Sequence, residues 1–183
     1  MMAAYTKKIQ DWQQLDGGLR YTWLVDYPTY SAFGTFELSS EDWEKRDFIV
    51  NFKGNSELTT EIDHQNAVDK AIKDVSELIT DTFSDEAKSI TLVCIPASTE
   101  ANTKRRFERF SQEVCDKTGM ENAYDRINED FLKGKNVIIF DDIIASGSSI
   151  CRFANHILSL GANVICAIAL GKKISDGYDQ EKT

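Results

Sequence analysis

VIIFDDIIASGSS, residues 137–149, is the segment of this chain that says most about its fold. Its first four residues are apolar and predict one short buried strand. Asp141 and Asp142 stand at the C-terminal end of that strand, and a loop of small, hydroxyl-rich residues separates them from a helical pattern that resumes at Ile150. Because ligands bind beyond the carboxyl ends of parallel strands, this order of elements predicts a ligand site.

The residues after this stretch predict a second strand, parallel to the first. Apolar residues recur at helical spacing between residues 150 and 158, and Gly161 is placed to end that helix. Residues 164–170 are another continuous apolar run, which is typical of a buried parallel strand. The order strand, helix, strand indicates a βαβ crossover.

The residues before the stretch predict a further strand and helix. Residues 90–95 form an apolar run, and a helical pattern with Phe107, Phe110 and Val114 on one side follows it and closes at Gly119. We therefore expect an α/β fold of three layers around a central, mainly parallel sheet, with an N-terminal α+β extension.

The loop at residues 145–149 has the chemistry of a phosphate site. Small side chains leave backbone N–H groups unobstructed at a helix N-terminus, Gly147 permits a positive φ, and three serines add hydroxyl donors. Asp141 and Asp142 can accept hydrogen bonds from vicinal ribose hydroxyls or help to hold Mg²⁺. The predicted ligand is therefore a ribose 5-phosphate.

Residues 137–149 resemble the phosphoribosyl pyrophosphate (PRPP) motif of type I phosphoribosyltransferases: hydrophobic residues, two acidic residues, two further residues and a Thr/Ser-rich loop with a glycine. Ala145 departs from it, because Thr or Ser is usual there. The resemblance implies the fold of that family and transfer of ribosyl 5-phosphate from PRPP to an acceptor, with Mg²⁺ and release of pyrophosphate. It implies Asp141 and Asp142 as catalytic residues and as direct or indirect Mg²⁺ ligands. The implied 5′-phosphate loop is Ala145, Ser146, Gly147, Ser148 and Ser149.

Residues 95–107 are similar to ComF-like phosphoribosyltransferases, in which a Pro-containing loop precedes an Arg and a Phe. This similarity implies that the loop and the helix after it bind pyrophosphate. A basic run at a helix start is also typical of a solvated face, and that alternative stays open. ComF-like proteins often carry an N-terminal zinc module, whereas this chain has no cysteine before Cys94. The implied pyrophosphate-binding residues are Ala97, Ser98, Thr99, Arg105 and Arg106.

We divide the chain into an N-terminal extension at residues 1–60, a phosphoribosyltransferase-like core at 61–173 and a flexible tail at 174–183. Residues 19–25 and 48–52 are expected strands, residues 39–42 resemble a helix N-terminus, and residues 63–83 form one apolar helical stripe. An aromatic cluster in the extension is either core or a stacking surface for a base. Its members are Trp23, Tyr27, Tyr30, Phe33 and Phe36.

Charge and composition restrict the partners. The net charge of −9 argues against a broad nucleic-acid or anionic-membrane surface, and the apolar runs are too short to span a membrane. We expect a small anionic ligand, PRPP or a nucleotide 5′-phosphate. Four cysteines without a C-x-x-C pair predict reduced, mostly buried thiols in a cytoplasmic protein, and His64 is expected to be solvated.

Three readings of the function stay open. Only residues 120–136 lie between the first core helix and the motif, which is short for the strand and mobile hood of full-sized phosphoribosyltransferases. The first is an enzyme whose active site is closed by a partner subunit, such as a second copy in a homodimer, or which hydrolyses PRPP. The second is a non-catalytic regulator that binds PRPP or a nucleotide. The third is an interaction domain with an incidental acidic loop.

Overall fold

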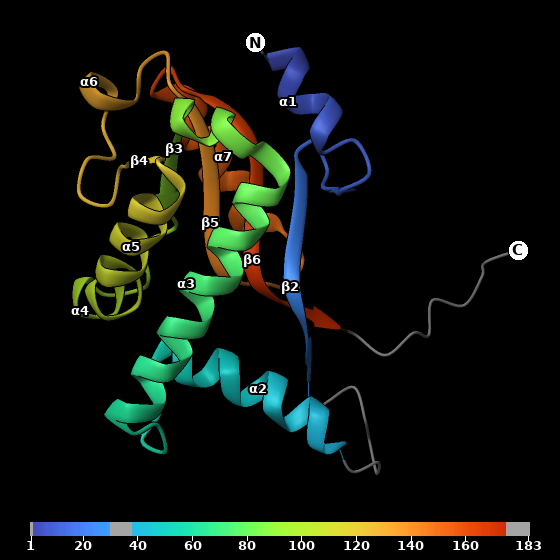
Figure 1. Ribbon diagram of the computed structural model, residues 1–183, viewed down its shortest axis with the longest axis vertical. Helices are drawn as coiled ribbons and strands as arrows, with labels where there is room; N and C mark the ends of the chain where they lie inside the picture. The colour runs from blue at the N-terminus through green and yellow to red at the C-terminus, as the bar shows by residue number, and fades with distance from the viewer. Residues whose placement is uncertain (1, 30–37, 175–183) are drawn as a thin grey trace, which may run out of the picture.

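A six-stranded sheet forms the centre of the computed structural model, which describes residues 2–29 and 38–174 (Figure 1). The strand order is β1-β2-β6-β5-β3-β4, and every neighbouring pair is parallel except β1 with β2. The strands are β1 (Gln13–Gln14), β2 (Arg20–Pro28), β3 (Ile90–Cys94), β4 (Glu121–Asn122), β5 (Asn136–Ile144) and β6 (Asn163–Ile174).

Helices cover both faces of this sheet, which confirms the expected three-layer α/β fold. On one face α7 packs on β5 and β6 through Ile150, Ala154 and Ile157. The helices α1, α2, α3 and α5 build the core on the other face. The helical segments are α1 (Met2–Lys8), α2 (Ser40–Lys53), α3 (Glu61–Phe83), the 3₁₀ segment η2 (Ser84–Ser89), α4 (Glu100–Thr103), the π-helical segment η3 (Lys104–Glu108), α5 (Arg109–Thr118), α6 (Glu129–Leu132) and α7 (Ser148–Ser159).

The βαβ crossover predicted around the acidic pair is confirmed as β5, α7 and β6. Strand β5 is longer than its four apolar residues indicate, because ladder pairing with β6 continues through Asp141, Ile143 and Ile144. The acidic pair therefore lies inside the strand and not in a loop after it. The helix predicted to close at Gly119 ends there, with that glycine in the left-handed region.

The expected strand at residues 48–52 is wrong, since these residues form the last turns of α2. The helix starts with a capping box between Ser39 and Asp42 and ends at Gly54, which adopts φ 66°. Phe48, Ile49 and Phe52 are buried, at a spacing that suits one face of a helix. The predicted helix N-terminus at residues 39–42 is confirmed.

The N-terminal segment belongs to the same sheet, because β2 pairs in parallel with β6 from Tyr21 to Pro28. Helix α2 lies at the end of the sheet where β2 and β6 finish (Figure 1). Strand β6 runs to Ile174, so residues 172–174 are part of the sheet. Residues 175–183 and three members of the aromatic cluster, Tyr30, Phe33 and Phe36, lie outside the described residues.

Candidate functional site

Two loops predicted to bind the ligand leave neighbouring strands at the same edge of the sheet. Strand β3 pairs in parallel with β5 from Ile90 with Asn136 to Cys94 with Phe140. The loop at residues 96–99 follows β3, and the loop at residues 145–147 follows β5. Because the carboxyl ends of parallel strands meet at one edge, the two predicted loops lie at the same end of the sheet.

The two aspartates of β5 have different surroundings. Asp142 is 5% exposed, and its Oδ2 accepts a hydrogen bond of 2.8 Å from Nη1 of the buried Arg106. Lys53 of α2 approaches the other oxygen, with 3.7 Å between Nζ and Oδ1. Asp141 shares neither contact, because successive side chains of a strand point to opposite faces. One of its oxygens accepts from the backbone N–H of Asp142 at 2.8 Å.

Arg105 and Arg106, predicted to bind pyrophosphate, contact the C-terminal end of α2. Nε of Arg105 donates to the carbonyl of Gly54 at 2.7 Å, and Nε of Arg106 donates to that of Lys53 at 3.2 Å. Arg105 also forms an ion pair with Glu61 at 2.9 Å. Cations at this end neutralise the negative pole of the helix, so the two arginines hold α2 against η3. Their pyrophosphate-binding role stays a prediction.

His64 lies at the same junction between the end of α2 and η3, and the prediction that its side chain is solvated is wrong. The side chain is 2% exposed, with Nδ1 2.8 Å from the carbonyl oxygen of Asn51 and Nε2 3.2 Å from that of Arg105. Helix α3 packs against both α2 and α5, which removes this first-turn residue from solvent. His64 therefore ties the start of α3 to the end of α2 and to η3.

The predicted 5′-phosphate loop has the backbone that such a site requires. Gly147 adopts φ 83° and immediately precedes α7, which extends for 12 residues. The four residues around it, Ala145, Ser146, Ser148 and Ser149, are exposed, whereas Gly147 is buried. A Cβ on Gly147 would stand 2.5 Å from Cδ2 of Leu15, so the β1–β2 turn packs against this loop.

The predicted pyrophosphate loop, Ala97 to Thr99, is partly occupied by its own hydrogen bonds. The backbone N–H of Ala97 donates to Oγ1 of Thr103 at 2.9 Å, and that hydroxyl donates to the carbonyl of Thr99 at 3.0 Å. The Thr99 side chain caps α4 by accepting from the N–H of Asn102. Ser98 and Thr99 are exposed at the strand edge, where a ligand can reach them.

The carboxyl of Asp141, at this edge, has a strongly shifted pKa. Burial, followed by the nearby charge of Asp142, raises its pKa from 3.8 to about 7, against the smaller lowering effects of the Asp142 N–H, Lys53 and Arg106. A buried carboxylate without an adjacent cation is costly to ionise. A positive charge close to Asp141 would therefore favour the ionised form of its carboxyl.

Asp141→Asn should stabilise the ligand-free protein at high pH. Because the folded-state pKa is raised, the wild type loses stability as the pH rises from about 4 to 7, whereas asparagine keeps the acceptor oxygen without the charge. We expect a gain of roughly 1–3 kcal/mol at pH 8 and little change at pH 4. Urea unfolding with EDTA at both pH values measures this, and an equal effect of the substitution at both would contradict it.

The residues fit Mg²⁺ only together with a phosphate ligand. Across residues 2–29 and 38–174, no three His, Cys, Asp or Glu side chains lie close enough together to hold a metal ion. Asp142 is engaged with Arg106, which leaves Asp141 as the more available carboxylate. Since Mg²⁺ is usually bound by one or two carboxylates plus substrate phosphates, this edge suits an ion delivered with the substrate.

The described part of the aromatic cluster is engaged in packing. Trp23 stacks on Tyr21 with ring centroids 5.6 Å apart, and Nζ of Lys172 lies 4.3 Å from the Trp23 ring. The guanidinium of Arg46 lies 5.1 Å from the centroid of Tyr27. A base-stacking role for this cluster stays a prediction.

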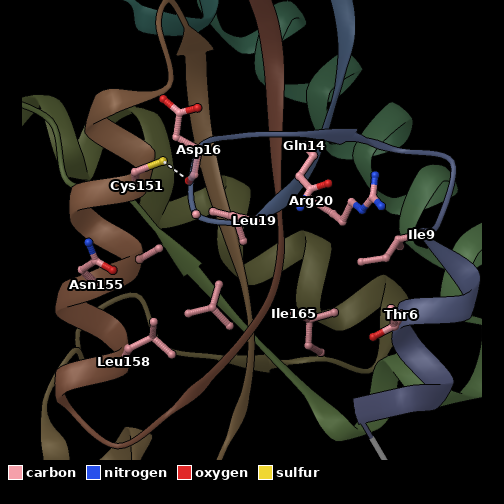
Figure 2. A pocket seen from close by; sticks show the side chains of 14 residues that line it. Thr6, Ile9, Gln14, Asp16, Leu19, Arg20, Cys151, Asn155, Leu158 and Ile165 are labelled. Carbon is pink, nitrogen blue, oxygen red and sulfur yellow. Dashed lines mark hydrogen bonds between the residues drawn. The ribbon is translucent and has the colours of Figure 1, made fainter.

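The lining of a cavity of about 500 Å³ includes neither Asp141 nor Asp142. Figure 2 shows its lining from α1, the β1–β2 turn and α7, with Ile165 at the start of β6. The Cys151 thiol, half-buried, donates to the carbonyl of Asp16 at 3.6 Å. The other three cysteines are buried and free, as expected, and burial raises the pKa of Cys115 to about 12.

None of the helices in the described ranges is long and apolar enough to cross a membrane.

Sequence reasoning missed two residues of the site. Lys53 directly follows residues 48–52, the segment expected to be a strand, and Leu15 lies in a turn without a functional signal. The spacing of Phe48, Ile49 and Phe52 between a capping box and a glycine is the signal that places Lys53 at a helix end.

The comparisons with known proteins concern mainly the C-terminal part of the chain. Residues 102–183, slightly less than half of the chain, match the family model "Phosphoribosyl transferase domain". This match agrees with the resemblance drawn from residues 137–149 and does not single out the ComF-like group. No curated protein sequence matches significantly. A hypoxanthine-guanine-xanthine phosphoribosyltransferase is among the similar solved structures, with 17% identity, a TM-score of 0.39 and coverage of 63% of this chain and 69% of that one.

Proposed function

We propose that this protein binds PRPP at the carboxyl edge of β3 and β5 and transfers its ribosyl 5-phosphate to an acceptor. The observation that carries the proposal is the path of the chain after Asp141 and Asp142. It passes through a loop of small residues and a left-handed Gly147 directly into the N-terminus of α7. Such a helix end offers free N–H donors and partial positive charge to a 5′-phosphate.

Different residues bind the different parts of PRPP. The backbone of residues 145–149 and the hydroxyls of Ser146, Ser148 and Ser149 hold the 5′-phosphate. Asp141 accepts hydrogen bonds from ribose hydroxyls, and the loop at residues 97–99 receives the diphosphate. Bound with that diphosphate, Mg²⁺ would supply charge that stabilises the leaving pyrophosphate.

Transfer follows from orientation and charge. The bond between C1 of the ribose and the diphosphate oxygen breaks, and pyrophosphate leaves with the electron pair as the nucleophile of the acceptor forms the new bond to C1. Positive charge grows on the sugar in between, and the Asp141 carboxylate stabilises it from the β5 strand. The ionised form of the Asp141 carboxyl would be favoured by Mg²⁺ bound beside it.

A non-catalytic PRPP or nucleotide regulator is the second candidate. Two observations favour it: Ala145 removes one hydroxyl donor from the phosphate loop, and the segment between α5 and β5 contributes only the two-residue strand β4 and one short helix, α6. A site that is open to water would bind the ligand without directing it to an acceptor. The ComF-like subfamily assignment belongs to the enzymatic reading, and it rests on the order Ile95, Pro96, Ser98, Arg105 and Phe107.

Turnover of PRPP separates the two candidates. Purified protein is incubated with PRPP and Mg²⁺, alone and with panels of bases and amines, and pyrophosphate release is measured. If the protein is an enzyme, pyrophosphate release should depend on one class of acceptor and should fall at least tenfold in Asp141→Asn. Saturable binding without any release across the panels would identify the regulator.

A further inference from the structure

We propose that Lys53, from the N-terminal half of the chain, is the cation that binds the diphosphate of PRPP. This inference rests on the proposed function and adds a specificity-determining residue to its site. It assigns the role to a side chain outside the predicted motifs and outside the segment that the family model covers.

The four basic residues nearest the start of the helix after the β3 loop, between residues 104 and 109, already have acidic partners. Arg109 bridges Asp69 and Glu113, and Lys104 lies 3.8 Å from Glu108. Arg105 pairs with Glu61, and Arg106 is buried against Asp142. A diphosphate that used Arg106 would have to break a buried ion pair, and the carboxylate left behind would be uncompensated at a cost of several kcal/mol.

Lys53 contacts its acidic partner, Asp142, less closely than Arg106 does. Its ammonium lies 3.7 Å from Oδ1 of Asp142, a carboxylate whose other oxygen already has a 2.8 Å hydrogen bond from Arg106. The Lys53 side chain is 30% exposed, whereas that of Arg106 is 10% exposed. Lys53 can therefore turn toward a ligand while Arg106 continues to neutralise Asp142. A flexible lysine stem suits this movement, since its ammonium acts as a point charge without fixed geometry.

The position of Lys53 favours the diphosphate over the 5′-phosphate. The 5′-phosphate loop leads into α7, which covers one face of the sheet. Lys53 ends α2 on the other face, beside η3, which continues the helix that starts with α4 after the β3 loop. A PRPP molecule with its 5′-phosphate at α7 would extend its diphosphate across the strand ends toward this second face, where the Lys53 ammonium lies beside Asp142.

The junction described above fixes this placement. At the end of α2, the carbonyls of Lys53 and Gly54 accept hydrogen bonds from Arg106 and Arg105. Nδ1 of His64 lies 2.8 Å from the carbonyl oxygen of Asn51. The backbone of Lys53 is thus held directly by the arginine that pairs with Asp142. Arg105, Arg106 and His64 act as positioning residues for Lys53.

Titration calorimetry with three probes tests this role. Wild type, Lys53→Gln, Lys53→Arg and Lys45→Gln are titrated with PRPP, pyrophosphate and ribose 5-phosphate in the presence of Mg²⁺. Lys45 is a matched control, because it lies on the same helix, is 28% exposed and pairs with Glu41. Thermal unfolding confirms that each variant is folded. We expect Lys53→Gln to weaken PRPP and pyrophosphate binding about 10- to 100-fold.

Each outcome has a separate meaning. Ribose 5-phosphate should bind Lys53→Gln as it binds wild type, Lys53→Arg should keep most of the PRPP affinity, and Lys45→Gln should match wild type. Unchanged PRPP binding by Lys53→Gln overturns the inference and leaves the proposed function standing. An equal loss for ribose 5-phosphate also overturns the assignment to the diphosphate. Failure of folded wild type to bind PRPP instead overturns the proposed function itself.

Discussion

Gly147→Val is expected to weaken PRPP binding by at least about a hundredfold. Gly147 adopts φ 83°, a backbone conformation that β-branched residues rarely reach. Its Cβ would also lie 2.5 Å from Cδ2 of Leu15 and so displace the Leu15 side chain. The strained loop turns N–H groups of residues 145–149 away from the 5′-phosphate. Calorimetric titration with PRPP and Mg²⁺ measures the loss.

Gly134→Val provides the matched control for backbone strain. Gly134 has φ 77°, close to that of Gly147, and no heavy atom lies within 4 Å of the position of an added Cβ. We expect each substitution to cost about 1–3 kcal/mol of unfolding free energy, whereas only the one at Gly147 should affect ligand binding. Wild-type PRPP affinity in folded Gly147→Val would remove this loop from the site.

Arg106→Met should be among the most destabilising single substitutions on this edge. It leaves Asp142, which is 5% exposed, with only the 3.7 Å contact to Lys53, and it removes a hydrogen bond to the end of α2. Removing one partner of a buried ion pair typically costs about 3–5 kcal/mol. Urea unfolding at pH 7 measures the change, and Arg105→Met, which breaks a more exposed pair, should cost clearly less.

A double substitution tests whether the loss comes from the orphaned carboxylate. Arg106→Met with Asp142→Asn removes the uncompensated charge, so we expect it to be at least about 1 kcal/mol more stable than Arg106→Met alone. Additive losses would mean that Arg106 stabilises the protein mainly through its packing and its bond to Lys53. The ion pair would then have no part in holding η3 to β5.

The core of the fold was predictable because its signals are local. The apolar runs of β3, β5 and β6 carry no competing helical period, and glycines stand at the ends of the helices between them. Residues 48–52 were predicted to form a strand because Phe, Ile and Val favour strands. They belong instead to a helix that starts with the capping box at Ser39, ends at the left-handed Gly54 and packs against α3. Tertiary packing overrides propensity in such short runs.

The site was predictable only where one segment contains it. Residues 141–149 lie together in sequence, and their order indicates a sugar phosphate without knowledge of any other part of the chain. The partners of Asp142 are 36 and 89 positions away at Arg106 and Lys53, and they depend on which face of β5 the side chain takes. The length of β5 decides that face, and the apolar run alone does not reveal it.

Calorimetric titration of the wild-type protein with PRPP and Mg²⁺ shows whether the carboxyl edge of β3 and β5 binds PRPP, as we propose. We expect saturable 1:1 binding that is lost in Gly147→Val and kept in Gly134→Val. Absence of binding by folded wild type, or equal binding by both variants, would contradict the claim and leave the motif as part of the scaffold.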